Sequence, residues 1–204
     1  MPLLVKICGI TTAEDAAMAA AAGADAIGIN LWSGSKRYVA PEGVRAVLAA
    51  VPAGVLKVGV FVDAPAAEVA RAMAELGLDR AQLHGDEQAA DYGALDEDRV
   101  IKVVRVRDDG SMTGAGDWNP GLWLYDAYVE GFGGGGVAAP WPVVARAARR
   151  PFLLAGGLGP DNVAEAIRAT RPDGVDVASG VEQRPGVKDA AKVAAFVAAA
   201  RAAL

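Results

Sequence analysis

Short apolar runs alternate along the chain with Ala-rich amphipathic stretches. Several of these runs are apolar on both faces, as parallel strands covered by helices must be. The eight runs expected to form strands are Leu3–Ile7, Asp25–Asn30, Val55–Val62, Arg80–Leu83, Val100–Val106, Leu122–Tyr125, Phe152–Ala155 and Gly174–Ala178.

The stretches between and after these runs are expected to form helices. Several begin with Pro or Asp near the first turn, and several stop just before Gly or Pro, as helices commonly do. The helical stretches are Thr12–Ala22, Pro41–Val51, Pro65–Leu76, Asp86–Gly93, Pro140–Arg149, Pro160–Thr170 and Lys188–Ala203.

Strict alternation of strand and helix predicts parallel βα units. Eight such units in 204 residues suit an α/β protein that is a single (β/α)8 TIM barrel, with residues 1–204 as one domain. A doubly wound open sheet is the alternative that the pattern leaves open. The segment 107–121 is polar and Gly-rich without a helical period, so helix 5 of the barrel is expected to be short or missing.

Composition narrows the class of protein. The net charge is -5 and the pI about 4.9, which argues against a nucleic-acid binder. Hydrophobic residues make up 53% of the chain, yet no apolar run reaches the roughly 18 residues of a membrane span, and no signal peptide is recognised. The single cysteine permits no internal disulfide, which fits a cytoplasmic protein.

Two groups capable of acid–base chemistry stand where predicted strands end. Cys8 follows the first apolar run, and Asp126 ends the run Leu122–Tyr125. In a barrel, the carboxyl ends of all strands meet at one rim, which is where active sites lie. A thiol and a carboxyl group at that rim form a candidate acid–base pair.

Glycine-bearing segments follow the last three predicted strands. Gly156-Gly157 and Ser179-Gly180 come after the seventh and eighth strands, where barrels commonly bind phosphate through backbone N–H groups. A longer glycine run, which includes Gly134 and Gly135, follows the sixth strand. It is interpreted as a loop that closes over a ligand and adds N–H donors, with a surface linker as the alternative.

These segments resemble, in order and from end to end, the phosphoribosylanthranilate isomerase family of tryptophan biosynthesis. The family is a single (β/α)8 barrel. The segments that carry the resemblance are Lys6-Ile7-Cys8-Gly9-Ile10-Thr11, Val58-Gly59-Val60-Phe61-Val62, Gln82-Leu83-His84-Gly85, Asp126 with Gly133-Gly134, Leu154-Ala155-Gly156-Gly157-Leu158 and Val175-Asp176-Val177-Ala178-Ser179-Gly180-Val181-Glu182.

The resemblance implies a role for several residues. The general base of the family falls on Cys8, its general acid on Asp126, and the arginine that meets the anthranilate carboxylate on Arg37. Its phosphate loops fall on Gly156-Gly157 and Ser179-Gly180.

Three segments depart from the family pattern. They read Ser35-Lys36-Arg37 for Ser-Pro-Arg, Gly133-Gly134-Gly135-Gly136 for Gly-Gly-Thr-Gly, and Ala139-Pro140-Trp141 for Phe-Asp-Trp. The last departure removes an acid that is expected to cap the following helix. The departures bear on loop order and substrate affinity more than on the chemistry.

The implied reaction is an Amadori rearrangement of N-(5′-phosphoribosyl)anthranilate, an aminoaldose, into an aminoketose. One acid opens the ribose ring and one base removes the C2′ proton, so neither a cofactor nor a metal is required. Asp126 must then be protonated, which needs burial or a nearby anion. Cys8 must be a thiolate, which a nearby cation would favour.

Strand geometry predicts the surroundings of the thiol. Lys6 and Cys8 share a face of the first strand, so Lys6 is expected one layer deeper, where a lysine needs a partner. Because the eighth strand neighbours the first in a closed barrel, that partner is expected to be Asp176. Gln82 and His84 share a face of the fourth strand and are expected to be structural and hydrogen-bonded.

Other functions remain open at this point. One alternative is a related phosphosugar enzyme, such as the histidine-pathway aminoaldose isomerase or the indole-forming synthase. Another is an inactive barrel that serves as a binding or scaffold module. A monomer is favoured over a homodimer, because the Ala-rich outer helices carry few large apolar residues.

Overall fold

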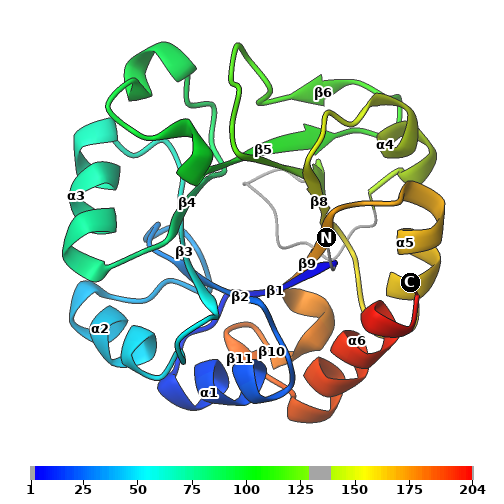
Figure 1. The fold of residues 1–204 in the computed structure, drawn as a ribbon, viewed down its shortest axis with the longest axis horizontal. Helices are drawn as coiled ribbons and strands as arrows, with labels where there is room; N and C mark the ends of the chain where they lie inside the picture. The colour runs from blue at the N-terminus through cyan, green and yellow to red at the C-terminus, as the bar shows by residue number, and fades with distance from the viewer. Residues whose placement is uncertain (1–2, 129–138, 204) are drawn as a thin grey trace.

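Eight parallel strands close into a barrel in the computed structural model, which describes residues 3–128 and 139–203 (Figure 1). Closure is made by β1, which pairs with β2 on one side and with β9 on the other. The barrel strands are β1 (Leu4–Cys8), β2 (Ala26–Asn30), β3 (Leu56–Phe61), β4 (Arg80–Leu83), β5 (Val100–Val106), β7 (Leu122–Ala127), β8 (Phe152–Leu154) and β9 (Gly174–Val177). All eight coincide with the predicted runs, and the closed barrel replaces the open-sheet alternative.

Helices surround the barrel, as the ring of coiled ribbons in Figure 1 shows. They are α1 (Ala13–Ala21), α2 (Pro41–Ala49), α3 (Ala66–Leu76), α4 (Trp141–Ala147), α5 (Val163–Thr170) and α6 (Ala190–Ala202). The side chains of Thr12 and Asp189 cap the first turns of α1 and α6. Pro140 precedes α4 without a side-chain cap, as expected from the missing acid.

The segment after β4 is a correction to the sequence prediction. In place of a helix over Asp86–Gly93, the structure has two short 3-10 turns, η1 (Ala89–Tyr92) and η2 (Glu97–Arg99). The Glu87 carboxylate accepts hydrogen bonds from the backbone N–H groups of Asp63 and Gly85, which ties the start of this segment to the barrel. A tertiary contact therefore replaces the helical turn that local sequence favours.

The segment after β5 confirms that helix 5 is missing. A two-residue strand, β6 (Met112–Thr113), pairs antiparallel with β5, and no helix lies in 107–121. Trp118 covers this side of the barrel, and its indole N–H donates to the carbonyl oxygen of Glu87.

Two separate cores follow from the alternation of side chains along each strand. The smaller one fills the barrel, and the larger one lies between the strands and the helices. The inner core comprises Ala26, Val58, Ile101, Val103, Leu122, Leu124, Leu153 and Ala155. Most of this inner core lies toward the amino ends of the strands. Cys8 and Asp126 lie nearer the carboxyl ends of β1 and β7.

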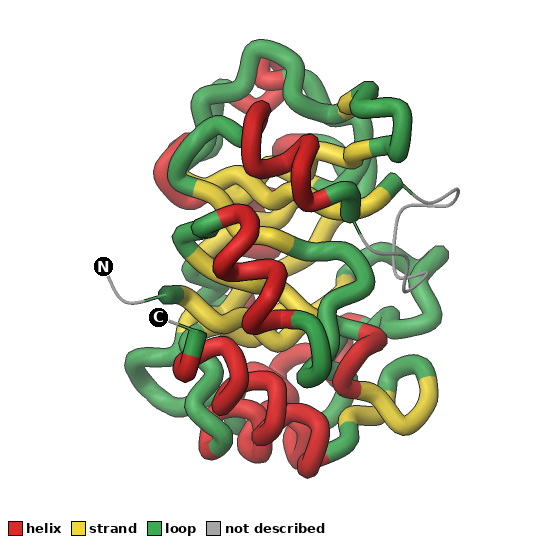
Figure 2. Tube along the Cα trace, turned by 90° about the vertical axis from the view of Figure 1, so that its right-hand side faces the viewer, coloured by secondary structure: helices red, strands yellow, loops and turns green. Residues whose placement is uncertain are grey.

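The two ends of the described chain lie on the same side of the molecule (Figure 2). Arg201 of α6 donates to the carbonyl oxygen of Leu3 and forms an ion pair with Asp25, with 2.6 Å between Nη2 and Oδ2. None of the helices in the described part of the chain is both long and apolar enough to cross a membrane. A short hairpin, β10 (Glu182–Arg184) and β11 (Val187–Lys188), follows the 3-10 turn η3 (Ser179–Val181).

Candidate active site

A buried ion pair lies inside the barrel beneath the thiol. Lys6 Nζ lies 2.8 Å from Asp176 Oδ1, and the two residues are also register partners of β1 and β9. Burial by itself lowers the pKa of Lys6, but Asp176 and Cys8 together raise it above its ordinary value. The predicted Lys6–Asp176 pair is confirmed.

Cys8 ends β1 directly above this pair and is partly exposed. A Cβ added to Gly28 would meet Cys8 Sγ at 2.7 Å and Lys6 Nζ at 3.1 Å, so glycine at this position leaves room for both groups. Burial raises the pKa of the Cys8 thiol, and the nearby Lys6 charge offsets only part of that rise. The expected cation is present, but its effect is smaller than that of burial.

Asp126 lies on β7, and its side chain is 13% exposed. Burial and then the negative charge of Asp176 raise its pKa to about 7, against a smaller opposing effect of the Ala127 N–H and Lys6. Both environments expected to raise the pKa are therefore present. The Lys6–Asp176 pair acts electrostatically on Cys8 and Asp126 alike, so it links the two groups.

His84 follows β4 and lies close to Asp126. Its Nε2 is 3.7 Å from Asp126 Oδ2, and its Nδ1 is 3.3 Å from Gln82 Nε2. Burial and the charges of Lys6, Arg105 and Lys102 lower the His84 pKa to about 3, so the imidazole is neutral at physiological pH. The expected hydrogen-bonded arrangement of Gln82 and His84 is confirmed.

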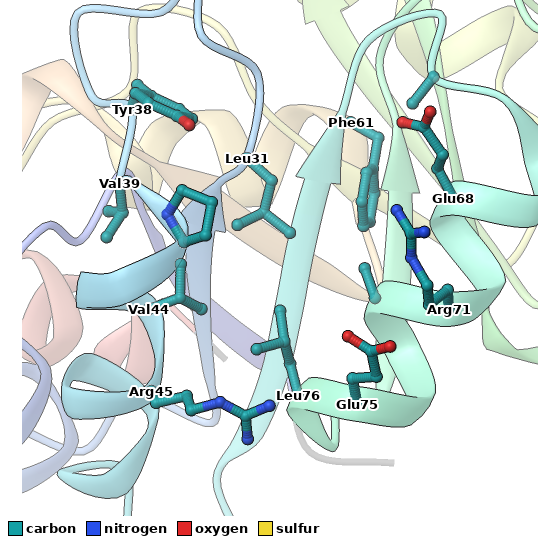
Figure 3. Close-up of a pocket in the computed structure, with 13 residues that line it drawn as sticks. Leu31, Tyr38, Val39, Val44, Arg45, Phe61, Glu68, Arg71, Glu75 and Leu76 are labelled. Carbon is teal, nitrogen blue, oxygen red and sulfur yellow. The ribbon is translucent and has the colours of Figure 1, made fainter.

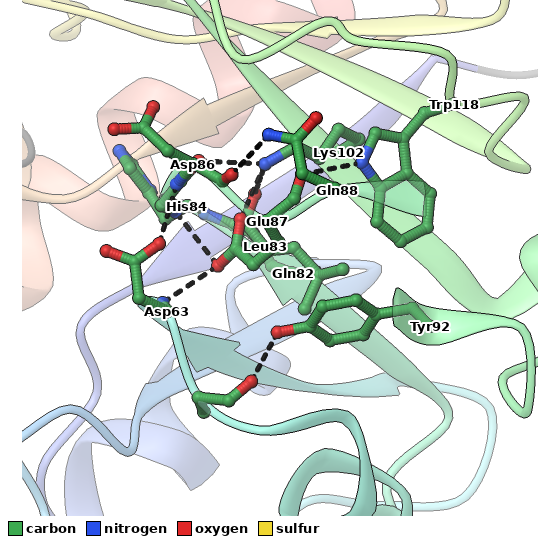
Figure 4. A network of polar contacts seen from close by, with 12 residues as sticks. Asp63, Gln82, Leu83, His84, Asp86, Glu87, Gln88, Tyr92, Lys102 and Trp118 are labelled. Atoms are coloured by element: carbon green, nitrogen blue, oxygen red, sulfur yellow. Dashed lines mark hydrogen bonds and ion pairs between the residues drawn. The ribbon is translucent and has the colours of Figure 1, made fainter. Parts of the chain in front are cut away.

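Polar contacts from β5 hold the segment that contains His84 (Figure 4). Lys102 Nζ donates to the carbonyl oxygen of Gly85 at 2.8 Å and to the Glu87 carboxylate at 2.5 Å. Lys102 is fully buried, and Arg105 pairs with Asp86 beside it. These contacts fix the backbone on either side of Gly85.

Arg37, in the loop between β2 and α2, forms a bidentate pair with Glu182. Its Nε and Nη2 lie 2.7 and 2.8 Å from the two carboxylate oxygens. A Cβ on Gly9 would meet Arg37 Cδ at 2.4 Å, so the arginine stem passes directly over the residue after Cys8. The structure thus brings Arg37 to the rim beside the thiol.

The two glycine loops after β8 and β9 pack against each other. Gly156 and Gly157 have φ values of +84° and +60°, which side chains other than glycine rarely adopt. A Cβ on Gly180 would meet the carbonyl oxygen of Leu158 at 1.9 Å, and Ser179 opens the adjacent turn η3. Gly134 and Gly135 lie outside the described residues.

A hollow lies on the outside of the barrel between α2 and α3 (Figure 3). It measures about 360 Å³, and Leu31, Val44 and Phe61 are among its apolar lining residues. Neither Cys8 nor Asp126 lines it. This hollow is therefore separate from the rim residues Cys8 and Asp126.

Sequence reasoning missed four charged residues around the site. Glu182 stands at the end of a segment that carries the family resemblance, but nothing local indicated its pairing with Arg37, 145 positions away. Lys188, Glu87 and Lys102 were also missed. Lys102 interrupts the apolar run of β5, and this interruption is the signal that could have found it.

The fold and the rim define a (β/α)8-barrel protein with a candidate acid–base site at the carboxyl ends of its strands. Residues 5–199 match the protein family described as N-(5′-phosphoribosyl)anthranilate (PRA) isomerase. The chain belongs to this family.

Relatives match over nearly the whole chain. The N-(5′-phosphoribosyl)anthranilate isomerase of Geobacter metallireducens is 46% identical over 200 residues, which cover 97% of this chain and 98% of the relative. That of Pseudomonas fluorescens is also 46% identical, with 96% and 94% covered.

Solved structures agree with the fold. The phosphoribosyl anthranilate isomerase of Thermotoga maritima superposes with a TM-score of 0.87 at 34% identity, covering 98% of this chain and 99% of the other. A phosphoribosyl anthranilate isomerase in complex with reduced 1-(o-carboxyphenylamino)-1-deoxyribulose 5-phosphate has a TM-score of 0.83 at 33% identity, with the same coverage.

Proposed function

We propose that this protein catalyses the Amadori rearrangement of N-(5′-phosphoribosyl)anthranilate to 1-(2-carboxyphenylamino)-1-deoxyribulose 5-phosphate, with Cys8 as general base and Asp126 as general acid. The observation that carries the proposal is a carboxyl group with a pKa of about 7 at the same rim as the only thiol of the chain. Family membership supports the substrate and the step in tryptophan biosynthesis.

Asp126 supplies the proton that opens the ribose ring. A carboxyl group with an ordinary pKa near 4 would be almost fully ionised at neutral pH, whereas a pKa of about 7 leaves about half of it protonated. His84 is neutral at this pH. It therefore does not lower the pKa of Asp126, as a positively charged imidazolium beside the carboxylate would.

Cys8 takes the C2′ proton once the ring is open. Burial makes its thiolate scarce but strongly basic, because a raised pKa increases the affinity of the thiolate for a proton. Lys6 stabilises the thiolate from below and, through Asp176, remains bound in the barrel. Burial is the main cause of both pKa shifts, and the Lys6–Asp176 pair modifies both.

The ends of the substrate are assigned by charge. Arg37 binds the anthranilate carboxylate, and the loops at Gly156-Gly157 and Ser179-Gly180 bind the phosphate through backbone N–H groups. Gly134 and Gly135 are assigned to substrate binding from the family resemblance of their segment. One acid and one base suffice for the two proton transfers, so the reaction as proposed uses no cofactor.

The test is turnover of freshly prepared substrate, followed as a decay of its fluorescence. Wild-type protein should show turnover, and Cys8→Ser and Asp126→Asn should each lower kcat by about 10²- to 10⁴-fold. A silent but folded wild-type protein would favour the alternative of an inactive binding barrel. Rates in both variants that match the wild type would remove the assigned roles.

We further propose a single-domain monomer in the cytoplasm. Among the described residues, the only large apolar side chains that are exposed are Tyr38 and Tyr128. A homodimer is the alternative, since the Thermotoga maritima relative is described as dimeric. Light scattering coupled to size-exclusion chromatography distinguishes a mass near 20.8 kDa from twice that value.

A further inference from the structure

We propose that Glu182 is a positioning residue that aims the guanidinium of Arg37 at the carboxylate of the substrate, and that Lys188 holds Glu182 in place. The proposal rests on the proposed function and adds to it the group that sets specificity for an acidic aromatic ring.

The carboxylate of Glu182 is fully used by the protein. Its Oε1 accepts from Arg37 Nε at 2.7 Å, from Lys188 Nζ at 3.0 Å and from the Gly186 N–H at 3.3 Å, while Oε2 accepts from Arg37 Nη2 at 2.8 Å. Burial alone would raise the pKa of Glu182, but Arg37 and Lys188 lower it, so it is ionised at neutral pH. A carboxylate with all its partners satisfied cannot rotate without losing several bonds.

Lys188 anchors this carboxylate from the hairpin. Its Nζ is buried and also donates to the carbonyl oxygen of Ala178 at 3.0 Å, directly before the phosphate-loop residue Ser179. Glu182 and Lys188 are register partners of β10 and β11. The hairpin itself is tied to the loop after β1, because the Thr11 hydroxyl donates to the carbonyl oxygen of Gly186 at 2.5 Å.

The bidentate pair leaves one edge of the guanidinium for a ligand. Glu182 occupies Nε and Nη2, and within residues 3–128 and 139–203 no acceptor is bonded to Nη1. The aliphatic part of the Arg37 side chain is fixed over Gly9. Only the rotation of its guanidinium group is left free, and the bidentate contact with Glu182 fixes that rotation. An arginine held in this way loses little conformational freedom when a carboxylate arrives.

Charge balance favours a single anionic group at this place. Arg37 and Lys188 each carry one positive charge and Glu182 one negative charge, so these three groups together carry a net positive charge that attracts a carboxylate. A substrate with an uncharged ring at this place would leave that charge without a partner. Glu182 therefore contributes to discrimination against ligands that lack the ortho carboxylate.

The experiment compares two probes on the full-length protein. One is reduced 1-(o-carboxyphenylamino)-1-deoxyribulose 5-phosphate, and the other is the same compound without the carboxyl group. In Glu182→Gln, Kd for the first probe should rise by about 10- to 100-fold, as loss of a charged hydrogen-bond partner implies. Kd for the second should change by less than about twofold, and KM should rise while kcat changes little.

Two further variants keep the result interpretable. Glu182→Asp retains the charge but shortens the side chain, so it should still weaken the carboxylated probe more than the other one. Glu75→Gln makes the same change of charge at an exposed site on α3 and should leave both affinities unchanged. Circular dichroism of each variant checks folding.

Equal weakening of both probes would show a merely structural role for Glu182 and overturn the proposal, as would unchanged affinity for both. These outcomes are read from binding alone. Absence of turnover by the wild-type protein would count instead against the proposed function, so the two failures are distinguishable.

Discussion

At the scale of single residues, the raised pKa values of Cys8 and Asp126 determine how activity responds to pH. Asp126 has a pKa of about 7, and the pKa of Cys8 is raised above its ordinary value. The proposed reaction needs the protonated acid and the ionised thiol together, although the acid has the lower pKa of the two. Only a small fraction of the free enzyme is therefore in the active protonation state at any pH.

The pH profile of kcat/KM tests this assignment. Below about pH 7 Asp126 stays protonated while the thiolate increases tenfold per pH unit, so log kcat/KM should rise with unit slope. Between pH 7 and the pKa of Cys8 the two ionisations cancel and the profile should be flat. His84, with a pKa of about 3, should contribute no limb in this range.

Asp126→Asn should remove the bend near pH 7 and leave a weak activity that keeps rising with pH until Cys8 is ionised. The measurement is kcat/KM from pH 5 to pH 9 at constant ionic strength, with enough variant protein to follow the residual rate. A bend near pH 7 that survives in Asp126→Asn belongs to another group and contradicts the assignment.

Residues differ in how far the sequence alone could place them. The Lys6–Asp176 pair could be predicted, because alternation along β1 and the pairing of β1 with β9 together determine which side chains of the two strands face each other. The Arg37–Glu182 pair could not, since Arg37 lies in a loop and Glu182 in a short hairpin 145 positions away, and no periodic pattern relates the two segments. The net rise of the Cys8 pKa also depends on burial, which a sequence does not quantify.

At the scale of elements, the loops after β8 and β9 behave as one unit. Gly180 packs so closely on Leu158 that an added Cβ would lie 1.9 Å from a carbonyl oxygen. Asn162 holds the other side, since its side chain accepts from the Gly159 N–H and donates to the Gly157 carbonyl. The proposed phosphate site therefore depends on how the two loops are packed, not only on their glycines.

Gly180→Ala should separate the two loops. Because backbone rather than a flexible side chain opposes the new methyl group, the variant should lose about 1–3 kcal/mol of unfolding free energy. Competitive inhibition by inorganic phosphate should weaken by at least about tenfold. Gly93→Ala is the control, because a Cβ there meets nothing within 4 Å. Unchanged phosphate inhibition in Gly180→Ala would argue against a phosphate site formed by both loops.

The elements also show where sequence patterns stop being sufficient. Strand runs and most helices were readable, because buried faces repeat with a period of two or 3.6 residues. The helix expected over Asp86–Gly93 was wrong, because Glu87 is bound to Lys102 and to two backbone N–H groups, which favours short 3-10 turns. Contacts of this kind join distant segments and override local propensity.

At the scale of the whole molecule, closure of the barrel makes every strand depend on its neighbours. The repeat of eight βα units predicted either a barrel or an open sheet, and the pairing of β1 with β9 is what distinguishes them. Closure also brings α6 beside α1, so the last helix packs against the first one. We call the β1–β9 pairing and the packing of α6 on α1 the seam. A substitution that destabilises the seam is therefore expected to destabilise the whole barrel rather than this region alone.

Phe196→Ala tests this expectation. Phe196 lies on α6 and is fully buried, so the cavity should lower the free energy of unfolding by about 3–5 kcal/mol. None of the four tryptophans lies on α6, α1 or β1, and Trp118 and Trp123 lie on the β5–β7 side. If the barrel unfolds as one unit, urea transitions followed by tryptophan fluorescence and by far-UV circular dichroism should shift together and remain coincident. A fluorescence midpoint that stays at its wild-type value while the circular dichroism signal shifts would mean that the seam opens independently of the rest of the barrel.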